Sequence, residues 1–524
     1  MNTPIIGTKA MVVSPHYLAS AAGARILERG GNAYDAAVAI SACLAVVYPH
    51  MTGLGGDAFW LMYNAGEGKM RAYNASGRSG EYATLDAYVD ESGIPLRGPR
   101  SIVTVPGMVD GWDAVIREYG RLSLAEVLEP AIRYAKEGFP MSPDQYQNTV
   151  LKRDVLHSTA STIYVPNGQI VRPGERFIQQ DVSRTLSGIA QFGRDHFYQG
   201  SIATEMSDFL QREGSILQFE DFASHHGDWV EPLRGSYRGY SIYQLPPNSQ
   251  GFVGLSILHT LEQFNLRDIP HGSSAYYHLL VEAIKLNFKD RDRYLTDPEF
   301  SSIPLERLLS KSYAKEQASL IQPNHALSLE TEPIGNDTAY AAVVDDEGNA
   351  VSFIQSLYFE FGSGVVAGNT GVILQNRGSF FSLSPSHVNC LAPYKRTFHT
   401  LMPAMACLDG KPAILYGTQG GEGQPQTQTA MITRMIDYDM TPEQAVSEPR
   451  FVWGRTWGQH TQELKLESRI SNQVAVDLAA KGHHVRIVDL MDGIMGHAHV
   501  IKISENGLIR GATDPRCDGA AIGW

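Results

Sequence analysis

Apolar residues fall into long helical stretches over much of the chain. Residues 30–50, GGNAYDAAVAISACLAVVYPH, predict one helix with Asn32 as its N-terminal cap and Pro49 just past its end. Its alanine-rich faces indicate close packing on other elements, so we expect a core helix. Further helices are predicted near residues 107–119, 122–137, 273–295 and 425–437, the last opening on Pro425.

The pattern changes after residue 337. Residues 338–358, TAYAAVVDDEGNAVSFIQSLY, are two apolar runs around DDEGN, and residues 400–418, TLMPAMACLDGKPAILYGT, are two more around LDGK. Turn residues between apolar runs are typical of β-hairpins. We therefore expect antiparallel strands from residue 338 to about 418, with helices on both sides, in a layered α/β architecture. No tandem repeat is visible, which argues against a solenoid.

The composition is that of a globular protein. Of 524 residues, 43% are hydrophobic and 19% charged, which is too apolar for a disordered chain. The net charge is −13 and no basic run could follow a phosphate backbone, so nucleic acid is not an expected partner. Length alone leaves the number of domains open, since large α/β enzymes often keep one continuous core.

A cytoplasmic location is predicted. The N-terminal stretch MNTPIIGTKAMVV lacks the basic start and apolar core of a secretory signal. The longest weakly polar run, residues 36–48, is well short of the ~20 residues that cross a bilayer, so no membrane span is expected. The cysteines form no CxxC pair and are typical of reduced thiols rather than of a disulfide framework: Cys43, Cys390, Cys407 and Cys517.

Thr338 directly follows a polar stretch, LETEPIGND, that predicts an exposed loop. Threonine is a common strand residue and needs no special role there. If Thr338 were the first residue of a chain, however, its α-amine, with a pKa of about 7.7 to 8.0, could take the proton from its hydroxyl and make it a nucleophile. The same hydroxyl could create that terminus by attacking the Asp337 carbonyl, shifting the acyl group from nitrogen to oxygen and leaving an ester for water to hydrolyse.

A series of motifs carries a resemblance to a known family. In order along the chain they are GGNAYDAAVA, TGLGGDAFW, VPGMVDGW, PPNSQG, DRYLTDPEF, DTAYAAVVDDEGNAVSFIQSLYFEFGSGVVAGNTGVILQNRG, GTQGGEGQPQT and GATDPR. From about residue 7 to the C-terminus, the chain resembles the γ-glutamyltranspeptidase family of N-terminal-nucleophile hydrolases. The resemblance implies a four-layer αββα sandwich and a precursor cut between Asp337 and Thr338. The large subunit, residues 1–337, and the small subunit, residues 338–524, would then share one core.

The resemblance also implies the catalytic residues. Thr338 would be nucleophile and base together, and Gly420 and Gly421 fall on the family's oxyanion glycines. Glycines between a strand and a helix let backbone N–H groups point at a developing oxyanion, although GG is also an ordinary strand-to-helix turn. Ser356 falls where the family carries a second threonine whose hydroxyl touches the nucleophile, and serine can keep that hydrogen bond.

The substrate pocket departs from the family pattern. Ser379 stands where the family has an aspartate that would hold a substrate ammonium, and Tyr358 replaces an asparagine. His399 and Thr400 replace a pair of serines. The family's early arginine has no match in register: Ser76 aligns best, and Arg78 lies two residues away. We therefore expect that a γ-glutamyl group is not the substrate.

The altered pocket suits a small anionic amide. Tyr358, Arg377, His399 and Arg78 offer hydrogen-bond donors and positive charge. The stretches SFIQSLYFEFGSGVV, LQNRGSFFSL, FHTLMPA and GGEGQPQTQ are most similar to the oxamate amidohydrolase branch, whose members cut oxamate to oxalate and ammonia. As an alternative, Arg377 could be structural and pair with Glu360. Tyr358 and His399 could equally be buried groups that backbone partners satisfy.

Other functions remain open from the sequence. A γ-glutamyltransferase or glutathione hydrolase would need the missing carboxylate at position 379. A cephalosporin-type acylase would share the nucleophile but need a wide apolar pocket, and an uncut chain could be a metabolite-binding or assembly protein. The expected partners are a small-molecule substrate and the other subunit of the same precursor, and a homodimer of such heterodimers stays open.

No metal and no cofactor are expected. The chain has 17 histidines, and GHAHV places His497 and His499 on one face of a strand, but no third ligand joins them at a recognisable spacing. The GLGGD stretch at 53–57 has neither the GxGxxG nor the P-loop spacing, so its glycines predict a tight helix-to-strand connection.

Overall fold

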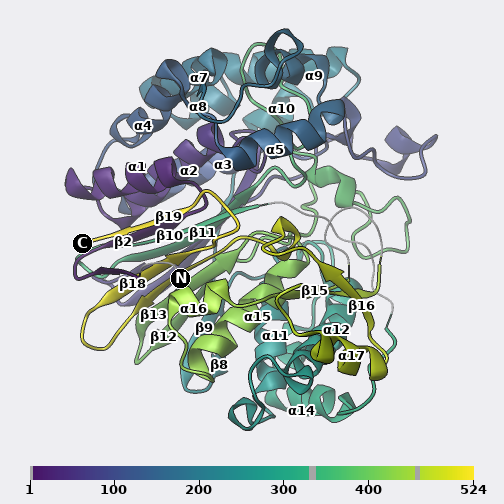
Figure 1. Cartoon of the computed structure of the whole chain (residues 1–524). Helices are drawn as coiled ribbons and strands as arrows, with labels where there is room; N and C mark the ends of the chain where they lie inside the picture. The colour runs from purple at the N-terminus through teal and green to yellow at the C-terminus, as the bar shows by residue number, and fades with distance from the viewer. Residues whose placement is uncertain (1–3, 330–337, 455–460) are drawn as a thin grey trace.

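Two seven-stranded antiparallel sheets form the centre of the computed structural model, which describes residues 4–329, 338–454 and 461–524 (Figure 1). Their strands are β1 (Ile5–Gly7), β2 (Met11–Ser14), β3 (Asp57–Asn64), β4 (Lys69–Ala75), β7 (Asp228–Val230), β8 (Leu233–Tyr237), β9 (Tyr240–Gln244), β10 (Ala339–Val344), β11 (Ala350–Ser356), β12 (Ala404–Leu408), β13 (Lys411–Thr418), β17 (Ala498–Ile503), β18 (Ile509–Thr513) and β19 (Ala520–Gly523). The first sheet has the order β1-β18-β17-β13-β12-β9-β8 and the second β19-β2-β10-β11-β3-β4-β7.

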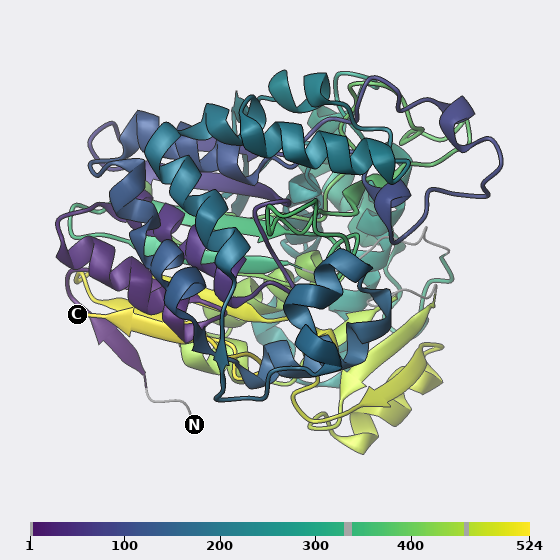
Figure 2. The ribbon, with the colours of Figure 1, turned by 90° about the horizontal axis from the view of Figure 1, so that it is seen from above.

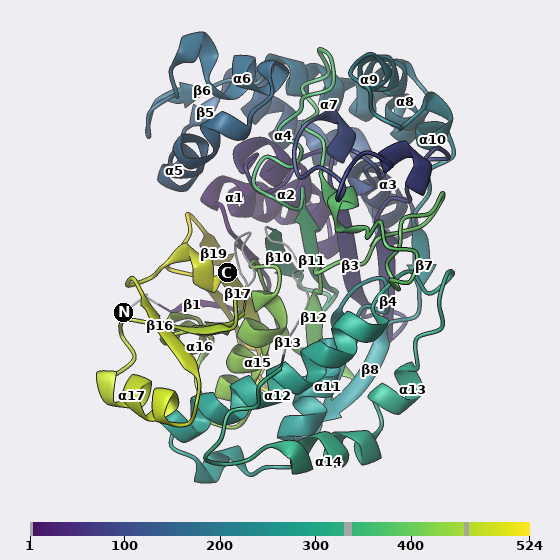
Figure 3. The same ribbon diagram turned by 90° about the vertical axis from the view of Figure 1, so that its right-hand side faces the viewer.

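Helices cover the outer face of each sheet. On the second sheet lie α1 (Tyr17–Glu28), α2 (Ala33–Val47) and α3 (Met108–Tyr119), and on the first lie α11 (Gly251–Leu261), α15 (Gly423–Ile436) and α16 (Pro442–Ser447). Figure 3 shows the two helical groups on opposite sides of the strands. The predicted four-layer αββα sandwich is therefore confirmed.

Further helices thicken both outer layers, and Figure 2 shows the helices of the first half of the chain, in purple to teal, lying over the strands. These helices are α4 (Leu124–Glu137), α5 (Pro143–Lys152), α6 (Ser158–Tyr164), α7 (Gln180–Phe192), α8 (Arg194–Tyr198), α9 (Ser201–Arg212), α10 (Phe219–Ala223), α12 (Ser274–Tyr294), α13 (Leu305–Leu308), α14 (Lys311–Leu320) and α17 (Asn472–Ala480). There are also two small sheets. One pairs β5 (Phe139–Pro140) with β6 (Arg176–Phe177), and the other has the strand order β14 (Phe451–Trp453), β15 (Glu463–Glu467) and β16 (His484–Val488).

Strand β10 is buried on both faces, and its sequence explains why. Ala339, Ala341 and Val343 belong to the core beneath the α1–α9 helices, whereas Tyr340, Ala342 and Val344 belong to the core between the two sheets. Side chains alternate between the two faces of a strand, so a strand in a central layer must be apolar at every position. This places Thr338, directly before β10, in the middle of the molecule.

The predicted elements are recovered with small shifts. The side chain of Asn32 accepts hydrogen bonds from the backbone of Tyr34 and Asp35 and caps α2, as expected. The hairpin of β10 and β11 pairs Val344 with Ala350 across its turn. Between residues 356 and 404 no further strand of the two sheets follows, so the expected run of strands to about residue 418 is interrupted by a long irregular segment.

Helix α15 begins at Gly423, two residues before the predicted start at Pro425. The backbone N–H groups of Gly423 and Gln424 donate to the carbonyls of Gly420 and Gly421, which closes the first turn early. Proline is still tolerated there, because the first N–H groups of a helix have no partner within it.

Both sheets combine strands from before and after residue 337. In the second sheet, β10 lies between β2 and β11, and β11 pairs with β3. In the first sheet, β12 pairs with β9, and β18 pairs with β1. Neither segment could bury its sheet faces without the other.

The four cysteines are all free thiols. Among the described helices, none combines the length and the apolar character that crossing a bilayer would require.

A buried ion network lies beside Gly496, just before β17 begins. Arg450 donates to the carbonyls of Met495 and Gly496 and lies 2.5 Å from the carboxylate of Asp514. Arg516 lies 3.0 Å from the same carboxylate. Burial alone would raise the pKa of Asp514, but the charges of Arg450 and Arg516 outweigh it and hold that pKa well below its usual range.

Replacing Asp514 by asparagine should lower the free energy of unfolding at pH 7 by about 3 to 5 kcal/mol, because the buried Arg450 loses its carboxylate partner and Arg516 is left with Glu467, 2.5 Å away. Because the pKa of Asp514 is depressed in the folded state, its stabilisation is present above the unfolded pKa of about 3.9 and is lost only as the pH falls below that value, so the deficit should persist at about pH 5 and shrink below about pH 4. Urea unfolding at about pH 7 and about pH 3 measures this. Asp409→Asn, at an exposed turn, is the control and should change stability by less than about 0.5 kcal/mol; equal effects of the two variants would contradict the assignment.

Candidate active site

Three buried polar residues lie side by side at one edge of the second sheet. Ala339 pairs with Gln355 and Ser356 pairs with Asp57, so Thr338, Ser356 and Asp57 follow one another across β10, β11 and β3. All three are fully buried. Polar groups at such depth need partners or a ligand, which marks this edge as the candidate site.

Thr338, beside Ser356, lies at one end of this group of three. The side-chain amide of Gln424 donates a hydrogen bond of 3.1 Å to its hydroxyl oxygen. The hydroxyl is thus held against the N-terminus of α15, whose partial positive charge favours negative charge on an attacking oxygen. Asp337, the other half of the predicted cleavage site, lies outside the described residues.

Gly420 and Gly421 form the turn between β13 and α15. Their φ angles are +119° and +48°, and a β-carbon on Gly420 would lie 3.4 Å from the Cα atom of Gly496. Glycine is favoured at positive φ. Within the described part of the chain neither of their N–H groups donates a hydrogen bond, so both are available to an oxyanion. The side chain of Gln250 fixes the turn by donating to the Gly421 carbonyl at 3.2 Å.

Ser356 connects the nucleophile edge to an arginine. Its hydroxyl oxygen accepts a hydrogen bond of 2.7 Å from the backbone N–H of Tyr358 and lies 3.4 Å from Nη2 of Arg377. Tyr358 has a φ of +87°, a region that costs a non-glycine residue energy and is often found at functional sites. Its ring lies against the guanidinium of Arg377, 4.4 Å from the ring centroid.

Arg377 is a buried cation without a carboxylate partner among the described residues. It is 1% exposed, and its Nε and Nη1 atoms make no hydrogen bond. Burial lowers its pKa to about 10, so it stays charged at neutral pH. The alternative that Glu360 pairs with it is wrong, because Glu360 binds Lys152 at 3.0 Å and Arg97 at 3.8 Å.

His399 is paired with Asp57, a residue that the sequence did not single out. Nε2 of His399 lies 3.2 Å from Oδ2 of Asp57. Burial, and next the charge of Arg377, lower the pKa of His399 to about 4, so its ring is neutral at pH 7. The other ring nitrogen, Nδ1, is buried, and no described residue forms a hydrogen bond with it.

The remaining predicted pocket residues occupy different surroundings. Thr400 is buried, and its carbonyl accepts from Gln250 at 2.7 Å. The hydroxyl of Ser379 donates to the carbonyl of Asn376 at 2.8 Å, and it brings no negative charge. The charge of Arg78 is already neutralised, because its guanidinium pairs with Asp228 at 3.3 Å and Glu299 at 3.1 Å.

The residues that the sequence analysis missed are Asp57 and Gln424. Asp57 ends the GLGGD stretch, where the glycines drew attention to a turn and away from the buried carboxylate. Gln424 lies inside the GGEGQPQT motif, two residues after a glutamate. A charged residue that directly precedes a long apolar run, as Asp57 precedes residues 58–62, was the available signal.

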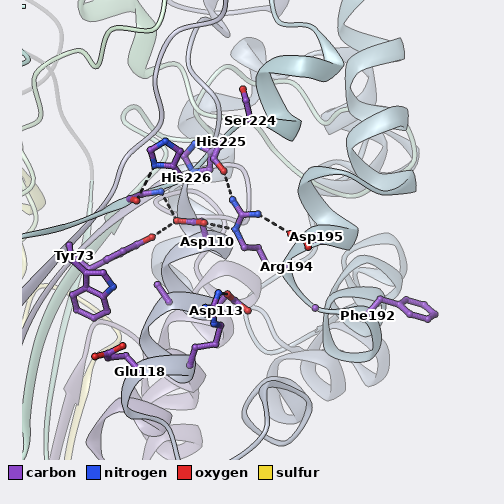
Figure 4. A pocket seen from close by; sticks show the side chains of 15 residues that line it. Tyr73, Asp110, Asp113, Glu118, Phe192, Arg194, Asp195, Ser224, His225 and His226 are labelled. Atoms are coloured by element: carbon purple, nitrogen blue, oxygen red, sulfur yellow. Dashed lines mark hydrogen bonds and ion pairs between the residues drawn. The ribbon is translucent and has the colours of Figure 1, made fainter. Parts of the chain in front are cut away.

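A surface pocket of about 650 Å³ lies elsewhere, over α3 and α8, and none of the predicted site residues lines it (Figure 4). At its floor Asp110 accepts hydrogen bonds from the hydroxyl of Tyr73 at 2.6 Å and the backbone of Gly227 at 2.7 Å, and it pairs with Arg194. Arg194 also donates to the carbonyl of His225. Asp110 and Arg194 thus already bind each other and their neighbours in the pocket wall, which does not favour them as ligand-binding groups.

In the described ranges one cluster, His278, Glu282 and His483, has metal-ligand chemistry. The two imidazoles already share a hydrogen bond of 2.8 Å. The carboxylate of Glu282 accepts from the ammonium of Lys285 at 2.8 Å and from the backbone of Leu327 at 2.6 Å. Since a lysine already neutralises the carboxylate, the cluster is better suited to joining α12 to its neighbours than to holding a cation.

The two facing sheets, with a threonine at the head of a central strand, define an N-terminal-nucleophile hydrolase fold. The sequence pattern described as Gamma-glutamyltranspeptidase matches residues 19–524. The chain belongs to the γ-glutamyltranspeptidase family and is an enzyme of this amidohydrolase class.

Three known proteins illustrate the similarity. The chain is 59% identical to the glutathione hydrolase-like YwrD proenzyme of Bacillus subtilis and 40% identical to the oxamate amidohydrolase proenzyme of Klebsiella pneumoniae, each over the full length of both chains. The crystal structure of a cephalosporin acylase from Bacillus halodurans superimposes with a TM-score of 0.93 at 35% identity, covering 100% of this chain and 97% of the other. These relatives carry three different substrate names, so family membership alone does not define the substrate.

Proposed function

We propose that the chain is a self-processing precursor that cuts itself between Asp337 and Thr338 and then hydrolyses a small anionic amide, oxamate being the best candidate. Large and small subunits, residues 1–337 and 338–524, would remain one αββα core because both sheets interleave their strands. The names of the relatives support self-processing, since both full-length matches are described as proenzymes. A cytoplasmic location stays a prediction.

The observation that carries the substrate proposal is the buried guanidinium of Arg377 beside Ser356, which has no carboxylate partner in direct contact among the described residues. The charge of Asp57 acts on it only at longer range, and a buried charge without a directly contacting counter-charge is costly, so a carboxylate ligand would supply the missing partner. Arginine is suited to this because its planar fork binds a carboxylate through two parallel hydrogen bonds. Oxamate carries its carboxylate directly beside the amide, which matches the short separation between Arg377 and the nucleophile edge.

The reaction would proceed through an ester. The hydroxyl oxygen of Thr338 attacks the amide carbonyl, its α-amine takes the proton, and Gly420 and Gly421 donate to the oxyanion. The carbon–nitrogen bond then breaks, the amine returns the proton to the departing nitrogen, and ammonia leaves. Water attacks the oxalyl ester on Thr338 and releases oxalate and the free hydroxyl.

Glutathione hydrolysis is the second candidate, favoured by the name of the 59% identical relative. A γ-glutamyl group carries an ammonium as well as a carboxylate and calls for a carboxylate in the pocket. Position 379 is a serine, and the carboxylate of Asp57 is already held by His399 and two backbone N–H groups. These contacts disfavour a γ-glutamyl substrate.

Purified protein should release ammonia from oxamate with a kcat/KM at least about 100-fold above its kcat/KM for glutathione, since the two substrates differ by an unneutralised buried ammonium. Ammonia release and γ-glutamyl product formation are measured in parallel, with a glutaryl amide to represent the acylases. Faster turnover of glutathione or of the glutaryl amide would refute the oxamate assignment and leave the family assignment intact.

A further inference from the structure

Two backbone hydrogen bonds hold the buried carboxylate of Asp57 in place. Its Oδ1 atom accepts backbone hydrogen bonds from Gly77 at 3.1 Å and Gly107 at 3.0 Å. Both glycines pack so closely that a β-carbon would lie 1.5 Å from the carbonyl oxygen of Val105 at Gly77, and 2.1 Å from that of Ala75 at Gly107. The loops around Asp57 therefore fix where its second oxygen, Oδ2, points.

That second oxygen determines the tautomer of His399. Oδ2 and Nε2 are 3.2 Å apart, and since a carboxylate only accepts hydrogen bonds, this contact favours the tautomer with the ring proton on Nε2. The neutral ring then presents a lone pair on Nδ1, which is buried and has no partner among the described residues. An unsatisfied buried acceptor is expected to face a donor supplied by a ligand.

The imidazole has little freedom to turn. The ring of Phe59 meets it edge to face at 4.9 Å between centroids. The backbone of His399 donates to Asn248 at 2.6 Å and accepts from Gln250 at 2.9 Å. Since the Gln250 side chain also binds the Gly421 carbonyl, His399 is anchored to the same residue that supports the oxyanion turn.

Building on the proposed function, we propose that Asp57 is a positioning residue that makes the site selective for an amide bearing an N–H. By fixing the proton on Nε2, it leaves Nδ1 of His399 to accept an N–H of the substrate amide, while Arg377 holds the substrate carboxylate. The pocket thus recognises an acceptor at one end of the substrate and a donor at the other. Sites that hydrogen-bond a substrate N–H discriminate strongly against analogues that lack it.

Asp57→Asn tests this with almost no change in shape. The asparagine oxygen can keep the bonds from Gly77 and Gly107, but its NH₂ group donates to Nε2 and moves the ring proton to Nδ1. The new N–H would face the N–H of the amide, as in other dyads where this exchange yields the wrong tautomer. We expect kcat/KM for oxamate to fall about 10- to 100-fold, and that for monoethyl oxalate, an ester without an N–H, to change less than about threefold.

Asp221→Asn is the matched control. Asp221 also accepts two backbone hydrogen bonds, from Glu81 and Gln218 at 2.8 Å each, and contacts no histidine. Asp221→Asn should leave the ratio of kcat/KM for oxamate to kcat/KM for monoethyl oxalate at the wild-type value. An equal fall on both substrates in Asp57→Asn would mean that Asp57 is merely structural, and this would overturn the proposal.

Nitrogen-15 NMR of histidine-labelled protein gives a readout that needs no turnover, with the His399 signals assigned through His399→Gln. Wild type should show a protonated Nε2 and a bare Nδ1, and Asp57→Asn should show the reverse. A protonated Nδ1 in wild type would overturn the proposal. If processed wild type hydrolyses neither oxamate nor the ester, the proposed function fails, and the NMR result still decides for or against the tautomer.

Discussion

Thr338→Ala should yield a single uncut chain of 57.5 kDa that releases no ammonia from any amide. The variant loses the only atom that the mechanism uses to attack both the Asp337 carbonyl and the substrate, so the two activities should vanish together. Thr338→Ser keeps a hydroxyl at this position and should restore cleavage at a reduced rate. Electrophoresis over several days and an ammonia assay measure both effects.

Thr370→Ala is the control for this experiment. Thr370 is also a buried threonine, and its hydroxyl donates to the carbonyl of Ala367 at 2.6 Å. It should be cut and active like wild type, apart from some loss of stability. A Thr338→Ala protein that still separates into two fragments at the same bond would show that another group performs the cleavage.

Arg377→Leu should lower kcat/KM for oxamate by about 10³-fold, because a buried charged partner of a carboxylate contributes about 2 to 5 kcal/mol. Its effect on stability should be small or favourable. The guanidinium has no carboxylate partner among the described residues and is flanked by Tyr358 and Phe380, so leucine replaces an unpaired charge by an apolar group in apolar surroundings. Steady-state kinetics and thermal unfolding separate the two effects.

Lys395→Met provides the comparison. Lys395 is also buried, but its ammonium donates to the carbonyls of Val388 at 2.9 Å and Cys390 at 3.0 Å. Its loss should reduce stability and leave kcat/KM nearly unchanged. If Arg377→Leu instead behaved like Lys395→Met, losing stability while keeping activity, Arg377 would be structural.

The features that the sequence predicted correctly are those that depend on local patterns and motifs. The cap at Asn32, the apolar run that became β10 and the turn between β10 and β11 depend on neighbouring residues, and each was recovered. Thr338 could be singled out because its chemistry depends on one peptide bond. The same locality explains the error at α15, where the turn of Gly420 and Gly421 begins the helix before Pro425.

The pocket partners could not be predicted because they join distant parts of the chain. Asp57 meets His399 only after β3, β11 and the segment after residue 356 are assembled. Arg78 was placed in the pocket by its position near the family's arginine, yet its guanidinium is paired with the carboxylates of Asp228 and Glu299. That no carboxylate in the described ranges pairs with Arg377 is likewise a property of packing and not of spacing.

Intact mass measurement of the purified wild-type protein, with N-terminal sequencing of each fragment, tests the central claim most directly. The account predicts two fragments that together make up 57.5 kDa, the smaller one beginning Thr338-Ala339-Tyr340. A single chain of 57.5 kDa that stays intact over days, or a cut at any other bond, would contradict the assignment of Thr338 as an N-terminal nucleophile.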